Sequence, residues 1–143
     1  MNILWIDDDA ERMASLYDTM KYEGHDVTKA ATAGEALEII EDEDRDGEFD
    51  VVLLDMMMPP DNALGAVDTD GGRTTGLALL TRIRQRYPDM PVVVCSVVKE
   101  PETKKEALRL GAKAWVQKPA LPSQILRAVE QACSPGTKSA GSV

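Results

Sequence analysis

Short runs of apolar residues recur along the chain, and polar or turn-forming residues flank each run. The clearest runs are residues 3–6, 51–54 and 92–95. Each run is too short for a typical helix and rich in residues that favour β structure, which is typical of strands buried on both faces of a parallel sheet. Two weaker patterns, at residues 26–30 and 114–117, predict two further strands.

Helical patterns separate these strands. Thr32 and Glu35 have the spacing of a capping box, Pro88 is placed to end a helix, and Pro101 is placed to begin one. Gly111 is typical of the residue that follows a helix. The helices are expected at residues 11–23, from residue 32 onward, and at residues 75–87, 101–111 and 122–132.

Strand and helix therefore alternate five times. This order predicts an α/β fold, a doubly wound five-stranded parallel sheet with helices on both faces. The 143 residues are about the length of one domain, which we expect to span residues 1–133. Residues 59–74 fit neither pattern and predict a long loop, and the small, polar residues 134–143 predict a disordered tail.

Composition narrows the class of function. A formal net charge of −9 argues against direct binding of nucleic acid, which needs clustered basic residues. No apolar run approaches the roughly 18 residues of a membrane span, and the N-terminus lacks the basic start of a signal peptide. We therefore expect a cytoplasmic protein without a membrane or nucleic-acid partner. Cys95 and Cys133 are expected to be buried free thiols.

Polar residues collect at the carboxyl ends of the predicted strands, where doubly wound sheets bind their ligands. They are Asp7, Asp8 and Asp9 after the first strand, Asp55 after the third, Ser96 at the end of the fourth, and Lys118 after the fifth. Crowded carboxylates repel one another unless they are protonated or share a cation, and clustered hard oxygens suit magnesium. A carboxylate nucleophile, a metal, an ammonium and a hydroxyl together suit phosphoryl transfer.

These residues resemble the response-regulator receiver family of two-component signalling, and the resemblance covers residues 2–133. The matching segments are Ile3-Leu4-Trp5-Ile6-Asp7-Asp8-Asp9, Val51-Val52-Leu53-Leu54-Asp55, Met58-Pro59, Pro91-Val92-Val93-Val94-Cys95-Ser96, Gly111-Ala112 and Lys118-Pro119. Each segment alone is weak evidence, but their order and their places at the strand ends make the match specific. The resemblance implies a flavodoxin-like receiver fold.

The resemblance also implies the chemistry of the acidic residues. Asp55 is expected to be the phosphoacceptor and to receive its phosphoryl group from a histidine kinase or a histidine phosphotransfer protein. Magnesium is expected to bind Asp7, Asp8, Asp55 and the backbone carbonyl of Met57. Asp8 is the expected direct ligand, and Asp7 is expected to act partly through water.

The remaining matches imply how the phosphoryl group is held and read. Lys118 and Ser96 are expected to bind its oxygens, and Ser96 and Trp115 are expected to rearrange as the switch. The Lys118–Pro119 bond is expected to be cis. Such a protein is a signalling phosphoacceptor rather than an enzyme, although it catalyses its own phosphorylation and dephosphorylation. Its downstream protein target and its oligomeric state do not follow from the sequence.

Some residues have structural alternatives. Asp7 and Asp8 also fit a turn that ends a strand, and Trp115 also fits a buried core position. Asp9 is interpreted as a cap on the first helix rather than as a metal ligand. In the long loop, the aspartates 61, 68 and 70 are interpreted as part of a surface that contacts a partner, with extra metal ligation as the alternative.

Two other functions compete with the phosphoacceptor. One is a receiver-like interaction module that works without phosphorylation, although the complete set of site residues argues against it. The other is a phosphatase of the haloacid-dehalogenase type, which also uses an aspartate nucleophile and magnesium. Such phosphatases need a second aspartate two residues after the nucleophile, where this chain has Met57.

Overall fold

The computed structural model describes residues 1–65 and 68–133, and within them five parallel strands form one sheet in the order β2-β1-β3-β4-β5. This confirms the predicted doubly wound fold, and each predicted strand lies within one residue of its expected bounds. The predicted tail, residues 134–143, lies outside the described residues. The strands are β1 (Asn2–Ile6), β2 (Asp26–Ala30), β3 (Val51–Leu54), β4 (Val92–Ser96) and β5 (Ala114–Gln117).

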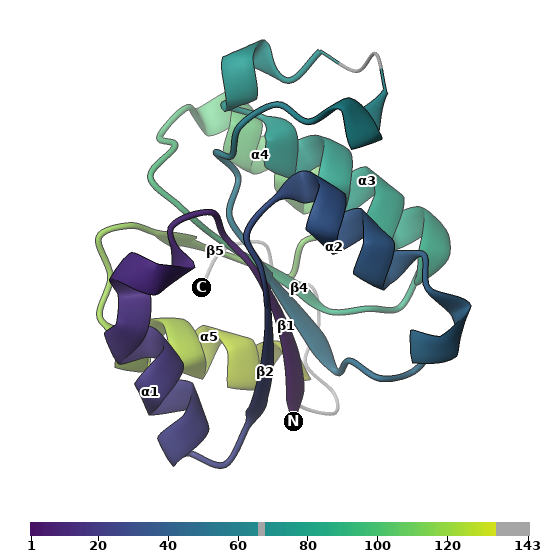
Figure 1. Cartoon of the computed structure of the whole chain (residues 1–143). Coiled ribbons are helices and arrows are strands. Elements are labelled where there is room, and N and C mark those ends of the chain that lie inside the picture. The colour runs from purple at the N-terminus through teal and green to yellow at the C-terminus, as the bar shows by residue number, and fades with distance from the viewer. Residues whose placement is uncertain (66–67, 134–143) are drawn as a thin grey trace.

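Helices cover both faces of the sheet (Figure 1). One face carries α1 (Ala14–Tyr22) and α5 (Pro122–Cys133); the other carries α2 (Ala33–Ile40), α3 (Thr75–Arg86) and α4 (Pro101–Arg109). The first predicted helix differs in its opening turn, which is a separate 3-10 helix, η1 (Ala10–Met13). No helix in the described residues is long and apolar enough to cross a membrane.

The unbroken apolar runs of the central strands serve both faces of the sheet. In β1, Leu4 and Ile6 pack with the helices α2, α3 and α4, whereas Ile3 and Trp5 pack with α1 and α5. Each of these side chains is at most 1% exposed. Complete burial of one such side chain contributes about 1.5–3 kcal/mol, so each central strand stabilises the core on both faces of the sheet.

The predicted capping box forms in part. The Glu35 N–H donates to the Thr32 hydroxyl (3.0 Å), but the Glu35 carboxylate accepts from the Ala31 N–H (2.8 Å), one residue before the expected donor. The long loop completes this helix end, because the Gly34 N–H donates to the Asp61 carboxylate (2.8 Å). The N–H groups of Gly34 and Glu35, which have no partner within the helix, thus donate to side-chain oxygens.

The long loop is tied to the fold at several points. It contains two short 3-10 turns, η3 (Asn62–Leu64) and η4 (Asp70–Gly72), and Leu64 is buried against α2 and α3. Near its other end the Gly72 carbonyl accepts from the Met58 N–H (3.0 Å), and the Thr75 hydroxyl donates to the Met58 carbonyl (2.7 Å). Both arms of the loop are therefore fixed close to the end of β3.

Helix α3 begins in close contact with the segment that follows β3. A Cβ at Gly76 would lie 2.6 Å from the Met56 Cα and 2.7 Å from the Asp55 carbonyl oxygen, which are backbone atoms. Gly76→Ala is therefore expected to lower the free energy of unfolding by about 2–3 kcal/mol in urea denaturation. Gly47→Ala is the control; its φ of 78° but open surroundings predict a loss of about 1 kcal/mol from backbone strain alone. Equal losses for the two variants would contradict the steric account.

Candidate functional site

The site forms where the carboxyl ends of the central strands meet. Ile6 pairs with Leu54 across β1 and β3, so the next residues, Asp7 and Asp55, lie side by side. The Asp55 N–H donates to the Ile6 carbonyl (2.9 Å), which extends the parallel pairing by one step. Asp7 is 1% exposed and Asp55 is 6% exposed, so two carboxylates are withdrawn from water at one edge of the sheet.

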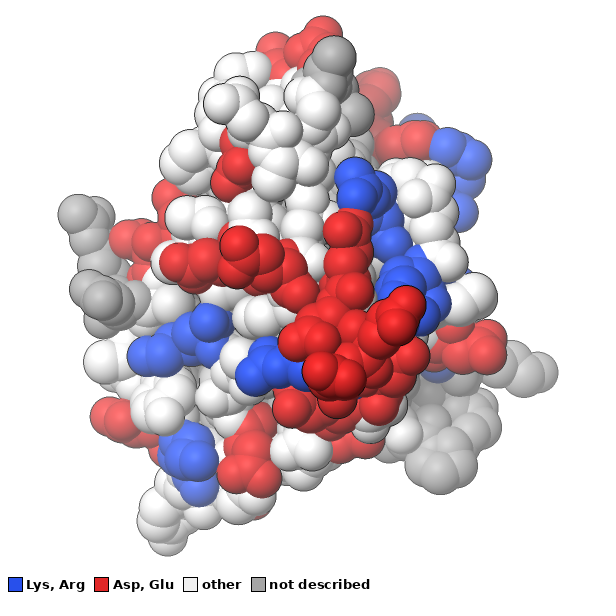
Figure 2. Space-filling view, turned by 45° about the vertical axis from the view of Figure 1, so that its right-hand side comes forward, with Lys and Arg blue, Asp and Glu red and all other residues white. Residues whose placement is uncertain are grey.

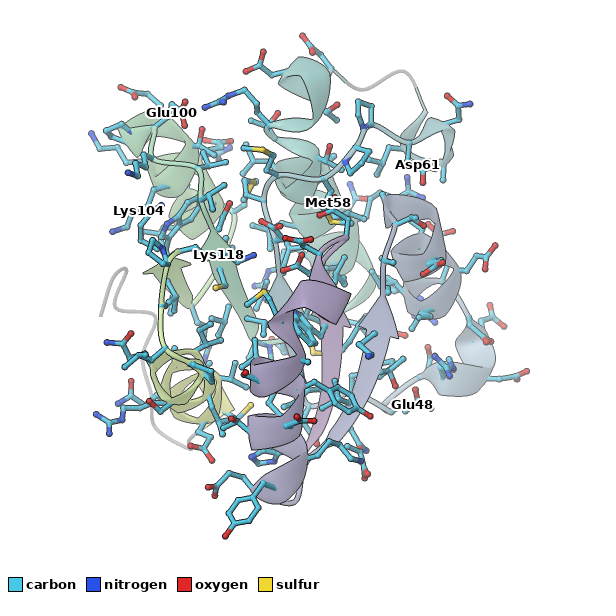
Figure 3. The ribbon with its side chains drawn as sticks, turned by 60° about the vertical axis from the view of Figure 1, so that its left-hand side comes forward. Glu48, Met58, Asp61, Glu100, Lys104 and Lys118 are labelled. Atoms are coloured by element: carbon cyan, nitrogen blue, oxygen red, sulfur yellow. The ribbon has the colours of Figure 1, made fainter. Side chains whose placement is uncertain are left out.

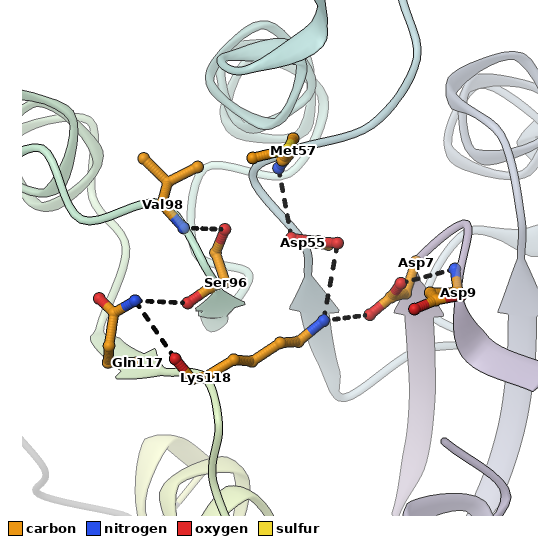
Figure 4. Close-up of polar contacts among 8 residues, drawn as sticks. All are labelled: Asp7, Asp9, Asp55, Met57, Ser96, Val98, Gln117 and Lys118. Atoms are coloured by element: carbon orange, nitrogen blue, oxygen red, sulfur yellow. Dashed lines mark hydrogen bonds and ion pairs between the residues drawn. The ribbon is translucent and has the colours of Figure 1, made fainter. Parts of the chain in front are cut away.

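Lys118 reaches these carboxylates from the end of β5 (Figure 4). Its ammonium lies 2.9 Å from an Asp7 oxygen and 3.6 Å from an Asp55 oxygen. Its backbone N–H donates to the Ser96 carbonyl (2.8 Å), and the Lys118–Pro119 peptide bond is cis, as expected. The structure thus brings together Asp7, Asp55 and Lys118 from three strands.

Burial and charge shift the pKa values of these groups. Burial raises the pKa of Asp55 to about 6; Asp7 also raises it, whereas Lys118, the Met57 N–H and the Ser96 hydroxyl lower it. Burial by itself lowers the pKa of Lys118, but the neighbouring carboxylates of Asp55 and Asp7 outweigh it and raise the pKa overall. The ammonium therefore stays charged at neutral pH and partly offsets the repulsion between the carboxylates.

Three carboxylates are placed to share a cation. Among the described residues, Asp7, Asp8 and Asp55 each offer an oxygen, and these oxygens lie within 4.8 Å of one another. Asp8 is exposed, and burial followed by the charge of Asp7 raises its pKa, so a cation would relieve both effects. All of these donors are hard oxygens, which fit magnesium, and the open side of the site leaves room for water.

Much of the negative charge lies elsewhere. Figure 2 shows acidic side chains gathered on the face that carries the segment after α2, beside blue Lys and Arg side chains. The exposed acidic residues of this segment are Glu41, Asp42, Glu43, Asp44, Asp46 and Glu48. Arg82 pairs with Glu41, and Arg86 pairs with Asp46. The net charge therefore does not itself mark the site, which depends on the positions of a few buried carboxylates.

The two residues predicted to form the switch are joined by a third. Ser96 is fully buried, and its hydroxyl accepts from the Val98 N–H (3.2 Å). Trp115 is buried, and its indole N–H donates to the Gln117 side chain (3.2 Å), whose amide donates to the Ser96 carbonyl (3.1 Å). No role for Gln117 was predicted, because its contacts depend on side-chain geometry that a strand pattern does not contain.

Among the described residues, the other acidic residues of interest lie outside the cluster of Asp7, Asp8 and Asp55. Asp9 occupies the N-cap position of η1, but the structure of this described turn shows no side-chain capping hydrogen bond, so the cap interpretation is wrong. Instead, the Asp9 N–H donates to an Asp7 oxygen (2.8 Å). In the loop, Asp61 caps the start of α2, Asp68 accepts from the Asp70 N–H (2.9 Å), and Asp70 lies 3.9 Å from Arg73. These bonds give the loop aspartates structural roles.

A cleft of about 1030 Å³ opens above Asp55. Met57 and Val97 are among the residues that line it, and Val97 is exposed. The Met57 N–H donates to an Asp55 oxygen (3.2 Å), whereas metal binding by the Met57 carbonyl stays a prediction. The long loop also lines the cleft and includes Arg73, a cationic residue for which the sequence predicted no role.

Comparisons with known proteins agree with this arrangement. The model of the response regulator receiver domain family matches residues 3–130. A CheY-like receiver domain from Methanospirillum hungatei superposes with a TM-score of 0.73 and 29% identity, covering 91% of this chain and 90% of that one. A Burkholderia pseudomallei response regulator with a phosphorylated aspartic acid, calcium ion and citrate superposes with a TM-score of 0.69 and 25% identity, covering 90% and 65%.

A longer relative shows how much of such a protein the chain represents. This chain is 26% identical to an NtrX-like response regulator of Rickettsia felis over 133 residues. These residues are 93% of this chain but 25% of that protein. The chain therefore spans about a quarter of the length of the NtrX-like proteins that it matches.

The raised pKa of Asp55 predicts a pH-dependent cost of folding. Between the ordinary value of 3.8 and the folded value of about 6, the folded chain binds more protons than the unfolded one, so its stability falls as pH rises through this window. In EDTA at pH 7, Asp55→Asn should therefore raise the free energy of unfolding by about 1–2 kcal/mol, and the gain should vanish near pH 4.

Urea unfolding between pH 4 and pH 8 measures this gain. Asp89→Asn is the control, because Asp89 is exposed and its replacement removes the same charge without relieving burial. An Asp55→Asn gain that is absent at pH 7, or equal at both ends of the pH range, would contradict the account.

Proposed function

Because the chain belongs to the response regulator receiver domain family, we propose that it accepts a phosphoryl group on Asp55 as a step in two-component signalling. The observation that supports this most directly is the contact of Lys118 with both Asp7 and Asp55, at distances of 2.9 and 3.6 Å. The donor would be a phosphohistidine on a histidine kinase or a histidine phosphotransfer protein. The domain would comprise residues 1–133.

The transfer exchanges one bond to phosphorus for another. An Asp55 oxygen attacks the phosphorus atom, a P–O bond forms, the P–N bond to the donor imidazole breaks, and the imidazole keeps the electron pair and takes up a proton. The Met57 N–H holds one Asp55 oxygen in place (3.2 Å). Lys118 and Ser96 would then bind the oxygens of the phosphoryl group, because an ammonium and a hydroxyl stabilise the charge that it brings.

Magnesium would supply a charge that neutralises the carboxylates and the transferred phosphoryl oxygens. The bonds of Asp7 favour an indirect role for this residue. One of its oxygens contacts Lys118 (2.9 Å) and the other accepts from the Asp9 N–H (2.8 Å). Asp8 is exposed at the cleft and is left as the more direct ligand, together with Asp55 and the Met57 carbonyl.

A relative supports both parts of the proposal. The Burkholderia pseudomallei structure contains a phosphorylated aspartic acid together with a calcium ion, and it superposes on 90% of this chain. A divalent cation and an acyl phosphate therefore occur together on a related fold. By the same reasoning we class this chain as a signalling phosphoacceptor rather than an enzyme.

The signal would leave through the face formed by α4, β5 and α5. Ser96 and Trp115 are joined through Gln117, so a displacement of Ser96 toward the phosphoryl group would disturb the buried indole. Binding of the active conformation by an unidentified protein, or onward transfer of the phosphoryl group, would carry the output. The competing function, an interaction module that works without phosphorylation, predicts that loss of Asp55 leaves partner binding unchanged.

Incubation with acetyl phosphate and magnesium tests the proposal. The intact mass should rise by one phosphoryl group, the label should be acid-stable but labile to base and hydroxylamine, and Asp55→Asn should remove at least about 95% of it. Asp8→Asn should slow labelling about tenfold or more, because metal binding is weakened. Asp89→Asn is the matched surface control and should label like the wild type. Labelling of Asp55→Asn at the wild-type level would overturn the assignment.

A further inference from the structure

We propose that Arg73, at the end of the long loop, binds the phosphoryl group on Asp55 and gives up its ion pair with Glu100 to do so. This inference rests on the proposed function and adds to it a phosphoryl-binding residue supplied by the long loop. It also connects the loop to the response to phosphorylation, because Glu100, the partner that Arg73 would leave, lies at the start of α4.

The backbone beside Arg73 is fixed at the rim of the cleft. The preceding residue, Gly72, accepts from the Met58 N–H (3.0 Å) and has a φ of 100°. A Cβ at Gly72 would lie 2.6 Å from the Met58 carbonyl oxygen, so this close approach requires glycine. Met58 in turn lies three residues after Asp55, and the loop is thereby held near the phosphoacceptor.

Once Asp55 is phosphorylated, the acidic groups around the cleft would carry more charge than Lys118 and magnesium together can offset. Among the described residues that line it, Asp8, Asp9 and Asp55 are acidic, and Arg73 and Lys118 are basic. Lys118 is already shared between Asp7 and Asp55. An acyl phosphate on Asp55 would carry about 1.5 to 2 negative charges at neutral pH, whereas the ionised carboxylate that it replaces carries one. A guanidinium is well suited to this group, because its planar N–H donors can bind two phosphoryl oxygens at once.

The present partners of Arg73 are exchangeable. Its guanidinium pairs with Glu100 and lies 3.9 Å from Asp70, and the side chains of Arg73 and Glu100 are 43% and 47% exposed. Ion pairs between side chains as exposed as these contribute little to stability, so a doubly charged competitor deeper in the cleft can displace Glu100. The surface pair keeps Arg73 ordered near the site until that competitor arrives.

The exchange would link Asp55 to α4. Glu100 occupies the N-cap position of α4, and its second carboxylate oxygen accepts from the Lys99 N–H (3.2 Å). Figure 3 shows Glu100 at the start of α4 and Asp61 at the start of α2, with Met58 between them. Asp61 fixes one arm of the loop to α2. Movement of Arg73 away from Glu100 would therefore mainly change the start of α4.

Beryllium fluoride with magnesium, a stable stand-in for an aspartyl phosphate, tests the inference. Its affinity is measured by ¹⁹F NMR for the wild type, Arg73→Ala, Arg73→Lys and Glu100→Gln. Arg73→Ala should weaken binding about fivefold to tenfold, Arg73→Lys should recover part of the loss, and Glu100→Gln should strengthen binding about twofold to threefold. In the double variant Arg73→Ala/Glu100→Gln, the gain from Glu100→Gln should disappear.

Two controls separate this role from a structural one. Arg82→Ala removes a similarly exposed arginine that pairs with Glu41 away from the cleft, and it should bind beryllium fluoride like the wild type. Arg73→Ala should keep the wild-type affinity for magnesium alone, which a general disruption of the site would lower. If the wild type binds beryllium fluoride and Arg73→Ala binds it with the same affinity, the role of Arg73 is overturned but the proposed function is not. Failure of the wild type to bind would overturn the proposed function as well.

Discussion

The structure depends on how buried carboxylates are tolerated at one edge of the sheet. Asp7 and Asp55 are brought together by the register of β1 and β3, and neither can move away without breaking that pairing. The ammonium of Lys118 lies against both, yet the pKa of Asp55 still rises to about 6. One cation therefore offsets only part of the cost of burial and of the repulsion from Asp7, and the edge remains able to stabilise a second.

The incomplete balance of charge among Asp7, Asp55 and Lys118 suits the site to binding a cation and a phosphoryl group. The same carboxylate that burial makes costly to ionise accepts a hydrogen bond from the Met57 N–H and lines an open cleft. A divalent cation and a phosphoryl group would enter the site as a complementary pair of charges. Because Lys118 is bonded through its backbone to Ser96, and Ser96 through Gln117 to Trp115, a change of charge at Asp55 has a short physical route to β5.

The sequence predicted the parts of this arrangement that topology alone determines. Asp55 and Lys118 each follow a recognisable strand, and the carboxyl ends of parallel strands must share one edge. Gln117 and Arg73 were missed because their roles depend on side-chain and loop geometry. Arg73 reaches the cleft only through the positive φ of Gly72 and its bond to Met58. The capping bond expected of Asp9 is not formed, because its carboxylate accepts no hydrogen bond from the first N–H groups of η1.

The central claim is that the acidic edge is built to hold a divalent cation through Asp8 rather than Asp9. Calorimetric titration of the unphosphorylated protein with magnesium tests it most directly. The account predicts weak binding, with a dissociation constant in roughly the millimolar range. Asp8→Asn should weaken binding at least about tenfold, and Asp9→Asn should change it about twofold or less. Magnesium binding that survives Asp8→Asn but is lost in Asp9→Asn would contradict the account.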